Sequence, residues 1–397
     1  MPEVRTDRPA LTEYPRLTVP DTSAVALAAL TTKVAATAAE YDRSGEVPTA
    51  GLLAAHRGGY LTATVAARYG GPESDPLEVA RILAALGAGD ASVALIAANN
   101  LQAHQLQTAT GAWPDDVYAE LVRRSLDGPV LLNAIRAEPE LGAPARGGLP
   151  ATVARRTPAG WVINGRKTFA TGGPALAYHI VWAVTDETPP RVGHFLVPAD
   201  ADGITWHDTW DHLGLRASNT HDVSYADVVV PASHFQEIPL VDGVYRDPAT
   251  TANPAVLGHA ALYVGVARAA RDAFAEFART RVPTALGRPI AETERIQVVA
   301  GEIETQLVAA ESLLFGTLLR LAAEPELAQR LPAVKVLIAR SAIAAVQAAV
   351  AALGNAALTR HHPLERHLRD VLCVRVHPPQ EDSALLATGR AVLSAAH

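Results

Sequence analysis

The chain has 397 residues and carries 34 Lys and Arg against 41 Asp and Glu, which gives a formal net charge of −7 at pH 7. This length predicts two or three domains. A composition of 49% hydrophobic and 19% charged residues is typical of a soluble globular protein. The acidic balance argues against nucleic acid as a partner, since no basic arm is present to meet phosphates. The single cysteine, Cys373, excludes an intramolecular disulfide and a cysteine-ligated metal cluster.

Membrane and export signals are weak. The first residues contain no apolar stretch behind a basic one, so no secretory signal is predicted. The uncharged run from Ser341 to Thr359 is nearly long enough to cross a bilayer, but it is rich in alanine and includes Gln347 and Asn355. We therefore interpret it as a buried helix and expect a cytoplasmic protein without a membrane partner.

The first 124 residues show helical periodicity. Helix start signals are Thr22-Ser23, Pro48-Thr49, Asp75-Pro76 and Asp90-Ala91-Ser92. They predict four helices, over residues 22–40, 48–56, 75–83 and 90–104. This part is an α-helical N-terminal domain, to which we assign residues 1–130.

The period changes near Leu131, where short runs typical of strands appear between turn residues. The runs cover residues 151–155, 160–163, 178–184, 192–197 and 222–230. Asn164-Gly165 is the favoured dipeptide of a type I′ turn, so it predicts a hairpin at that point. We assign residues 131–240 to a central antiparallel β-domain.

Helical periodicity returns after Pro254. It predicts helices over residues 255–281, 292–321, 332–353 and 382–395, which suggests a four-helix bundle over residues 241–397. The predicted fold class is therefore α+β: an N-terminal α-helical domain, a central antiparallel β-domain and a C-terminal four-helix bundle.

This order of domains resembles the acyl-CoA dehydrogenase superfamily of flavoproteins, and four local stretches carry the resemblance. They are Tyr69-Gly70-Gly71, residues 160–173 (GWVINGRKTFATGG), residues 210–231 (WDHLGLRASNTHDVSYADVVVP) and residues 363–370 (PLERHLRD). The resemblance implies a flavin cofactor, either FAD or FMN, and a homodimer or homotetramer.

Several residues are implied to contact that flavin. By resemblance, Phe169 covers the ring and Thr171 reaches its N5 edge. Arg216 and Ser218 lie near the flavin, and their alternation with Thr220 along an extended stretch predicts a shared face.

The resemblance also implies two contacts with the remainder of the cofactor. The loop that contains Glu138 and Gly142 resembles the segment passing the flavin pyrimidine and phosphates. Arg281 or Arg279, together with the turn at Gly354-Asn355, corresponds to the residues that bind the nucleotide half of the cofactor. The planar guanidinium group of an arginine suits the oxygens of a pyrophosphate.

The reaction depends on a base that is missing from its usual place. Acyl-CoA dehydrogenases usually carry a glutamate nine residues after the arginine that corresponds to Arg369, and position 378 here is proline. Residues 253–257, where other members place it, contain no acid either. Glu381 would have to act as a displaced base.

His377 is retained beside that position, and this pattern resembles the flavin-dependent monooxygenases of the same fold, which receive reduced flavin from a separate reductase. A histidine suits proton transfer near neutral pH. The resulting hypothesis is a monooxygenase that acts on a small organic substrate, with His377, Thr171 and Asn100 as catalytic residues and a flavin reductase as a partner.

Two alternatives stay open: an FAD-dependent dehydrogenase of acyl-CoA or acyl-carrier-protein thioesters, and a non-catalytic relative that only binds a ligand. The histidines 361, 362 and 367 do not have the spacing of ligands on one helix face, so no metal site is expected.

Overall fold

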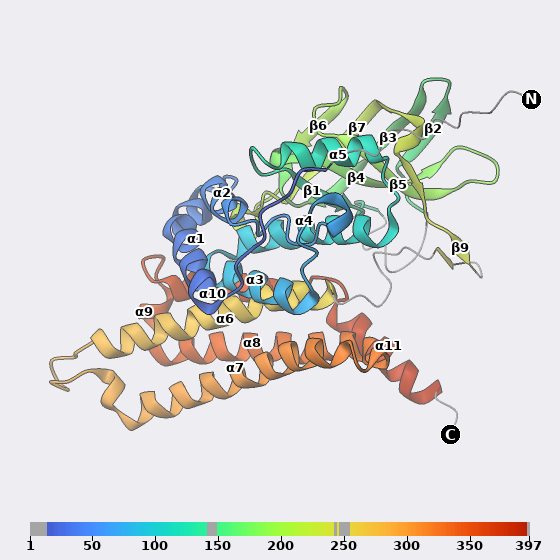
Figure 1. Ribbon diagram of the computed structural model, residues 1–397. Coiled ribbons are helices and arrows are strands. Elements are labelled where there is room, and N and C mark those ends of the chain that lie inside the picture. Colours follow the sequence, from blue (N-terminus) through green and yellow to red (C-terminus); the bar gives the residue numbers. More distant parts are fainter. Residues whose placement is uncertain (1–13, 141–148, 242–243, 246–254, 395–397) are drawn as a thin grey trace, which may run out of the picture.

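Three parts follow one another along the chain: N-terminal helices, a β-sheet and a helical bundle; in space the N-terminal helices lie between the sheet and the bundle (Figure 1). The structure, a computed structural model, describes residues 14–140, 149–241, 244–245 and 255–394. The predicted order of a helical domain, a sheet domain and a second helical domain is confirmed.

The N-terminal part contains five helices, one more than predicted. They are α1 (Ala24–Ser44), α2 (Thr49–Arg57), α3 (Pro76–Gly89), α4 (Ala91–Thr110) and α5 (Asp115–Arg124). The start signals act as expected: Ser23 caps α1, Asp75 forms a capping box with Glu78, and Asp90 caps α4. Helix α4 is buried on nearly all sides and lies centrally between the sheet and the bundle (Figure 1).

The central sheet has eight strands in the order β6-β7-β3-β2-β4-β5-β8, with β1 paired to β4. Their bounds are β1 (Leu131–Ile135), β2 (Val153–Thr157), β3 (Gly160–Ala170), β4 (Leu176–Thr185), β5 (Val192–Pro198), β6 (Ile204–His207), β7 (His221–Val230) and β8 (Phe235–Glu237). The sheet is mixed rather than purely antiparallel, because β1 and β2 both run parallel to β4. Parallel neighbours need a crossover, and the chain between them, which includes β3, supplies it. Beyond the sheet, β9 (Leu240–Val241) pairs with β10 (Val244–Tyr245).

The predicted hairpin at Asn164-Gly165 is wrong. Both residues lie inside β3, and the turn between β2 and β3 falls earlier, where Thr157 pairs with Gly160. The register of β3 against β7 shifts between Ile163 and Gly165, which marks a bulge. Asn164 exchanges two hydrogen bonds of 3.0 Å with Asp227 of β7, so the cross-strand partner fixes this conformation.

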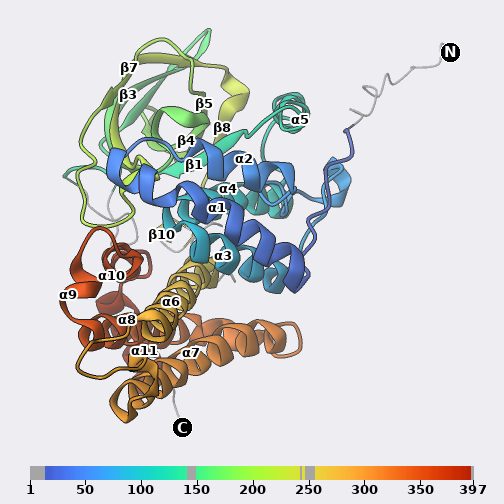
Figure 2. The same ribbon diagram turned by 90° about the vertical axis from the view of Figure 1, so that its left-hand side faces the viewer.

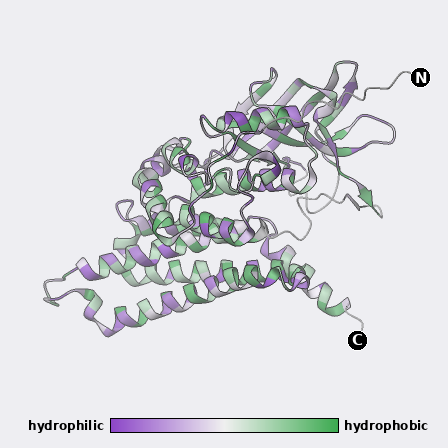
Figure 3. Cartoon of the chain, viewed as in Figure 1, coloured by the Kyte–Doolittle hydropathy of each residue, from purple (hydrophilic) through white to green (hydrophobic). Residues whose placement is uncertain are grey.

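The bundle contains three long helices, α6 (Ala255–Thr280), α7 (Glu294–Leu321) and α8 (Leu331–Leu353), and they run side by side (Figures 1 and 2). The shorter α9 (Asn355–Leu358), α10 (Pro363–Leu372) and α11 (Glu381–Ser394) complete it. The helices carry both hydrophobic and hydrophilic residues along their length (Figure 3), as expected for elements with one buried side.

Among the described residues, the helical segment Pro325–Leu353 alone is long and apolar enough to cross a membrane. Eleven residues of α8, within this segment, are buried in the interior, where α8 packs on α6, α7 and α10. These contacts are those of a core helix.

Helices α3 and α6 cross at close range because each has glycine at the contact. A Cβ atom at Gly87 would collide with the carbonyl oxygen of Leu262, and one at Gly265 with that of Ala84. The crossing fixes the N-terminal half of α6 against the N-terminal helices, where functional side chains project.

Candidate functional site

Phe169, next to the last residue of β3, has an unusual backbone conformation. Its φ is +58°, which a residue with a Cβ rarely adopts, and 55% of its surface is exposed. Its ring meets the edge of His212, and His212 stacks on Trp210 with ring centres 3.7 Å apart. The result is an exposed aromatic surface at the end of the strand, of the kind that covers a flat ligand.

A chain of three hydroxyl groups lies beside this surface. Ser218 Oγ is 2.7 Å from Thr220 Oγ1, and Thr220 donates to Thr171 Oγ1 at 3.1 Å. Because Thr220 has one hydroxyl hydrogen and gives it to Thr171, Ser218 must donate to Thr220. The hydrogen of Thr171 then has no acceptor among the described residues. It is the donor that an edge nitrogen or oxygen of a ligand would receive, so Phe169 and Thr171 together fit a flavin.

The loop that carries Ser218 is held by the bundle and by α1. Residues Arg216–Ser218 form a single 3₁₀ turn, and Asp370 of α10 accepts the backbone N–H of Leu215 at 2.8 Å. Arg216 donates from Nε to the backbone oxygen of Asp42 on α1. The prediction that Arg216 shares a face with Ser218 and Thr220 is therefore wrong, because the turn breaks the alternation of an extended strand.

Glu138 is buried, and its carboxylate is fully engaged. It pairs with Lys167 at 2.7 Å and accepts three further hydrogen bonds, from Thr152 N, Thr152 Oγ1 and Ala151 N. Burial opposes ionisation, yet the hydrogen bonds from Lys167 and Thr152 lower the pKa of Glu138 overall, and burial lowers the pKa of Lys167 to about 8. This side chain positions its loop. Gly142, the other predicted residue of the loop, lies outside the described residues.

Asn100 is also fully engaged. It donates to the backbone oxygen of Leu61 at 2.8 Å and accepts the N–H of Leu132 at 2.9 Å. Asn133, next along β1, donates to the backbone oxygen of Thr171 at 3.0 Å. Asn100 thus anchors α4 to the strand that supports Thr171.

His377 lies in a polar cluster contributed by three elements. Its Nδ1 atom is 3.2 Å from the hydroxyl of Tyr263, and its ring meets that of His259 with centres 5.3 Å apart. His259 Nε2 is 3.1 Å from Asn99 Oδ1 on α4. An amide oxygen only accepts, so His259 donates from Nε2. The preceding sequence reasoning missed His259, Tyr263 and Asn99. The spacing of four residues between His259 and Tyr263 on one helix face was the available signal.

The cluster keeps its histidines neutral at pH 7. Burial, together with the neighbouring His259 and Lys335, holds the pKa of His377 well below its usual range, and burial lowers that of His259 to about 4. Burial raises the pKa of Tyr263, which keeps its hydroxyl protonated. Since Tyr263 engages Nδ1 of His377, Nε2 can accept a proton in the tautomer in which Nδ1–H donates to the Tyr263 oxygen.

Lys335 fixes the backbone around His377. Its buried ammonium donates to the carbonyl oxygens of Val374, His377 and Pro379 at 2.9, 3.0 and 3.1 Å. Burial lowers its pKa to about 8, with Glu381 acting in the opposite direction. These three bonds hold the turn that presents His377.

Glu381, the alternative base, is engaged elsewhere. Its Oε1 atom accepts hydrogen bonds from Arg340 Nε and Nη2 at 3.0 and 2.6 Å, in an ion pair between α11 and α8. The carboxylate is thus bound to a cation, and no hydrogen bond joins it to the His377 cluster.

The residues predicted to bind the nucleotide half of the cofactor lie together at one end of the helical bundle. A pocket of about 470 Å³ there is lined by Arg281 and by Leu353 and Ala356, which flank Gly354-Asn355. Gly354 has a φ of +58° and ends α8, and Asn355 begins α9. The structure therefore brings Arg281 and this turn together, although they are more than 70 residues apart in the sequence.

Comparisons with known proteins match all three parts of the chain. Family models of the acyl-CoA dehydrogenase N-terminal, middle and C-terminal domains match residues 23–111, 134–228 and 257–379. YdbM of Bacillus subtilis, which carries an acyl-CoA dehydrogenase name, is 31% identical over 352 residues, 88% of this chain and 91% of its own length. The amino sugar nitrososynthase RubN8 of Streptomyces rubradiris is 33% identical over 368 residues, 87% of this chain and 83% of its own length.

Among solved structures, KijD3 in complex with dTDP superimposes with a TM-score of 0.79 and 28% identity, covering 95% of this chain and 98% of KijD3. The matched domains, the identity to YdbM and the fold agree with one another. The chain belongs to the acyl-CoA dehydrogenase family of flavin-dependent oxidoreductases.

Proposed function

We propose that this protein is a flavin-dependent monooxygenase that uses reduced flavin and oxygen to oxidise a small organic substrate with an acidic N–H or O–H group. The observation that carries the proposal is the setting of His377. Its neutral ring is positioned by Tyr263 and His259, whereas position 378 is proline and Glu381 is bound to Arg340.

The flavin, when bound, supplies the electrons that activate oxygen. Phe169 covers the flat ring, and Thr171 donates its free hydroxyl hydrogen to the ring edge. Either FMN or FAD satisfies these contacts. Arg281 and the Gly354-Asn355 turn would hold the nucleotide half of FAD in a neighbouring subunit of a homodimer or homotetramer.

His377 accepts the proton of the substrate at Nε2, which is free when Nδ1 carries the ring hydrogen and donates it to the Tyr263 oxygen. Tyr263 fixes the orientation of the ring through Nδ1, and Lys335 fixes the backbone that presents it. A separate flavin reductase would supply the reduced cofactor.

Two relatives support this reading. RubN8 is an amino sugar nitrososynthase, and forming a nitroso group from an amine adds oxygen to nitrogen. KijD3, 27% identical, has been solved with FMN and an amino sugar nucleotide. The acyl-CoA dehydrogenase name of YdbM supports the alternative, in which an acyl thioester is oxidised and Glu381 leaves Arg340 to act as base.

The test compares His377→Asn with the matched control His56→Asn on α2. With reduced flavin, oxygen and a panel of amines and phenols, we expect wild type and His56→Asn to form oxidised product. His377→Asn should lose about 10²-fold or more of the rate while binding flavin normally. Equal rates for the two variants would contradict the role of His377.

A further inference from the structure

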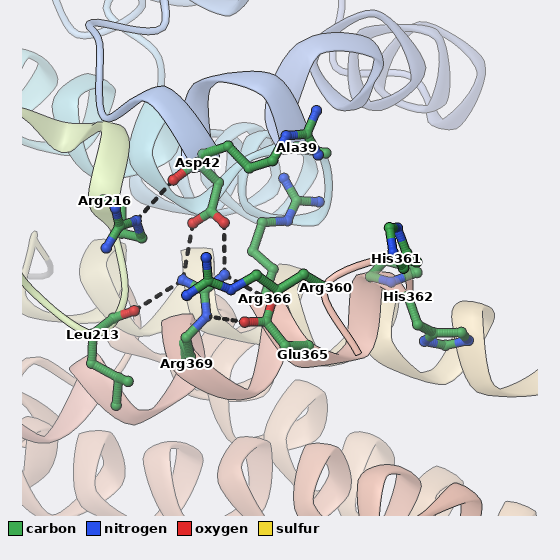
Figure 4. Close-up of a pocket in the computed structure, with 12 residues that line it drawn as sticks. Ala39, Asp42, Leu213, Arg216, Arg360, His361, His362, Glu365, Arg366 and Arg369 are labelled. Carbon is green, nitrogen blue, oxygen red and sulfur yellow. Dashed lines mark hydrogen bonds and ion pairs between the residues drawn. The ribbon is translucent and has the colours of Figure 1, made fainter. Parts of the chain in front are cut away.

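A crevice rich in arginine lies outside the site described above, where α1, the Leu213–Arg216 loop and α10 meet (Figure 4). Its volume is about 370 Å³, at the small end of the range for small-molecule pockets. Its charged lining residues are Asp42, Arg43, Arg216, Arg360, Glu365, Arg366 and Arg369. Five arginines against two carboxylates leave an excess of three positive charges among these side chains.

Both carboxylates are used by one arginine. Arg369 donates two hydrogen bonds to Asp42, two to Glu365 and one to the backbone oxygen of Leu213, which accounts for all five of its N–H groups. Asp42 lies at the centre of the view, joined by dashed lines to both Arg216 and Arg369 (Figure 4). These hydrogen bonds hold Asp42, Glu365 and Arg369 in place at the base of the crevice. Neither carboxylate of the lining is then left to pair with the other arginine side chains.

The remaining arginines keep unused donors. Arg43 and Arg360 are exposed and make no hydrogen bond or ion pair within the described part of the chain. Arg216 uses only Nε for its bond to Asp42, and its contact with Asp211 is long, at 3.8 Å. Arg366, which also lines the crevice, acts electrostatically on the buried carboxyls of Asp90 and Asp370.

The two buried carboxyls beside Arg366 are harder to ionise than exposed ones. Burial raises the pKa of both, that of Asp370 to about 7, even though Arg366 acts to lower it. A cleft lined by one sign of charge concentrates ions of the opposite sign.

We propose that this crevice binds the phosphate group of a small molecule, at a site separate from the flavin ring. The planar guanidinium groups of Arg43, Arg216 and Arg360 match the oxygens of a phosphate or diphosphate. An uncharged ligand would leave these positive charges without a counter-charge. The proposal does not depend on the proposed reaction, because it concerns binding alone.

The experiment is calorimetric titration of the full chain, with and without bound FMN. The probes are inorganic phosphate, pyrophosphate and ADP. We expect pyrophosphate to bind wild type, and Arg43→Gln and Arg360→Gln to weaken binding by about tenfold each. Arg57→Gln, which alters an exposed arginine of α2 outside the crevice, should bind as wild type does.

Tighter binding of ADP than of inorganic phosphate would identify an organic phosphate as the ligand, and equal binding would identify the free anion; both outcomes support the site. The proposal is overturned if pyrophosphate does not bind wild type, or if the crevice variants and Arg57→Gln bind it equally. Loss of pyrophosphate binding on addition of FMN would also overturn it, since the anion would then occupy the cofactor's own phosphate site.

Discussion

The bond between Asp42 and Arg369 should stabilise the whole chain, because it joins α1 to α10 across a distance of 327 residues in the sequence. Arg369 approaches Asp42 with two nitrogens, at 3.0 and 2.6 Å, and both side chains are only 15% exposed. Hydrogen bonds between charged groups contribute about 1.5–3 kcal/mol each when shielded, and partial exposure reduces this. We expect Asp42→Ala to lower the free energy of unfolding by about 2–4 kcal/mol.

The assay is urea denaturation followed by circular dichroism, with Asp211→Ala as the control. Asp211 also pairs with an arginine of this region, but at 3.8 Å and with a side chain that is 99% exposed. Its removal should change the free energy of unfolding by about 0.5 kcal/mol or less. In addition, Arg369→Met should cost less in the Asp42→Ala background than alone, with a coupling of about 1 kcal/mol or more. Equal effects of Asp42→Ala and Asp211→Ala would refute the reasoning.

Two further predictions concern packing and pH. Gly265→Ala should lower the free energy of unfolding by about 3 kcal/mol because its methyl group meets the α3 backbone, whereas Gly301→Ala, with open space around it on α7, should raise it by ~0.5–1 kcal/mol in the same urea assay. Five buried histidines have pKa values lowered chiefly by burial: those of His104, His179 and His259 to about 4, that of His367 to about 3, and that of His377 well below its usual range. They bind protons on unfolding below pH 6.5, while Asp370, whose pKa is raised to about 7, releases one. Asp90, whose pKa is also raised, releases at most one more, so the net uptake of three protons or more predicts that stability falls by about 4 kcal/mol per pH unit from pH 6 to 4.5, and unfolding midpoints that stay constant over this range would contradict it.

Features encoded by neighbouring residues could be predicted from the sequence. The helix starts at Asp75 and Asp90 depend on side chains that bond to the next turn, and both were identified. The position of Asn164-Gly165 inside a strand was not predicted, because the conformation of this dipeptide depends on Asp227 of a distant strand. The parallel pairing of β1 with β4 likewise depends on contacts between distant segments.

For the functional site too, prediction from the sequence depended on whether the residues are close together in the chain. Phe169 and Thr171 were recognised from a local segment, but the order of the hydroxyl chain required Thr220 and Ser218 to be placed beside them. The spacing of His259 and Tyr263 places them on one face of α6 but does not show what that face contacts. They become neighbours of His377 only because the α3–α6 crossing and Lys335 hold two distant segments together.

Use of reduced flavin with oxygen distinguishes the proposed monooxygenase from a dehydrogenase. The most direct measurement is the oxidation of reduced FMN or FAD by oxygen, followed by flavin absorbance with and without the protein, beside an anaerobic titration of the flavin-loaded protein with acyl thioesters. We predict that the protein binds reduced flavin and changes the rate of its oxidation, and that thioesters leave the bound flavin oxidised. Anaerobic bleaching of the flavin by a thioester, with no effect of the protein on reduced flavin, would contradict the proposal and identify a dehydrogenase.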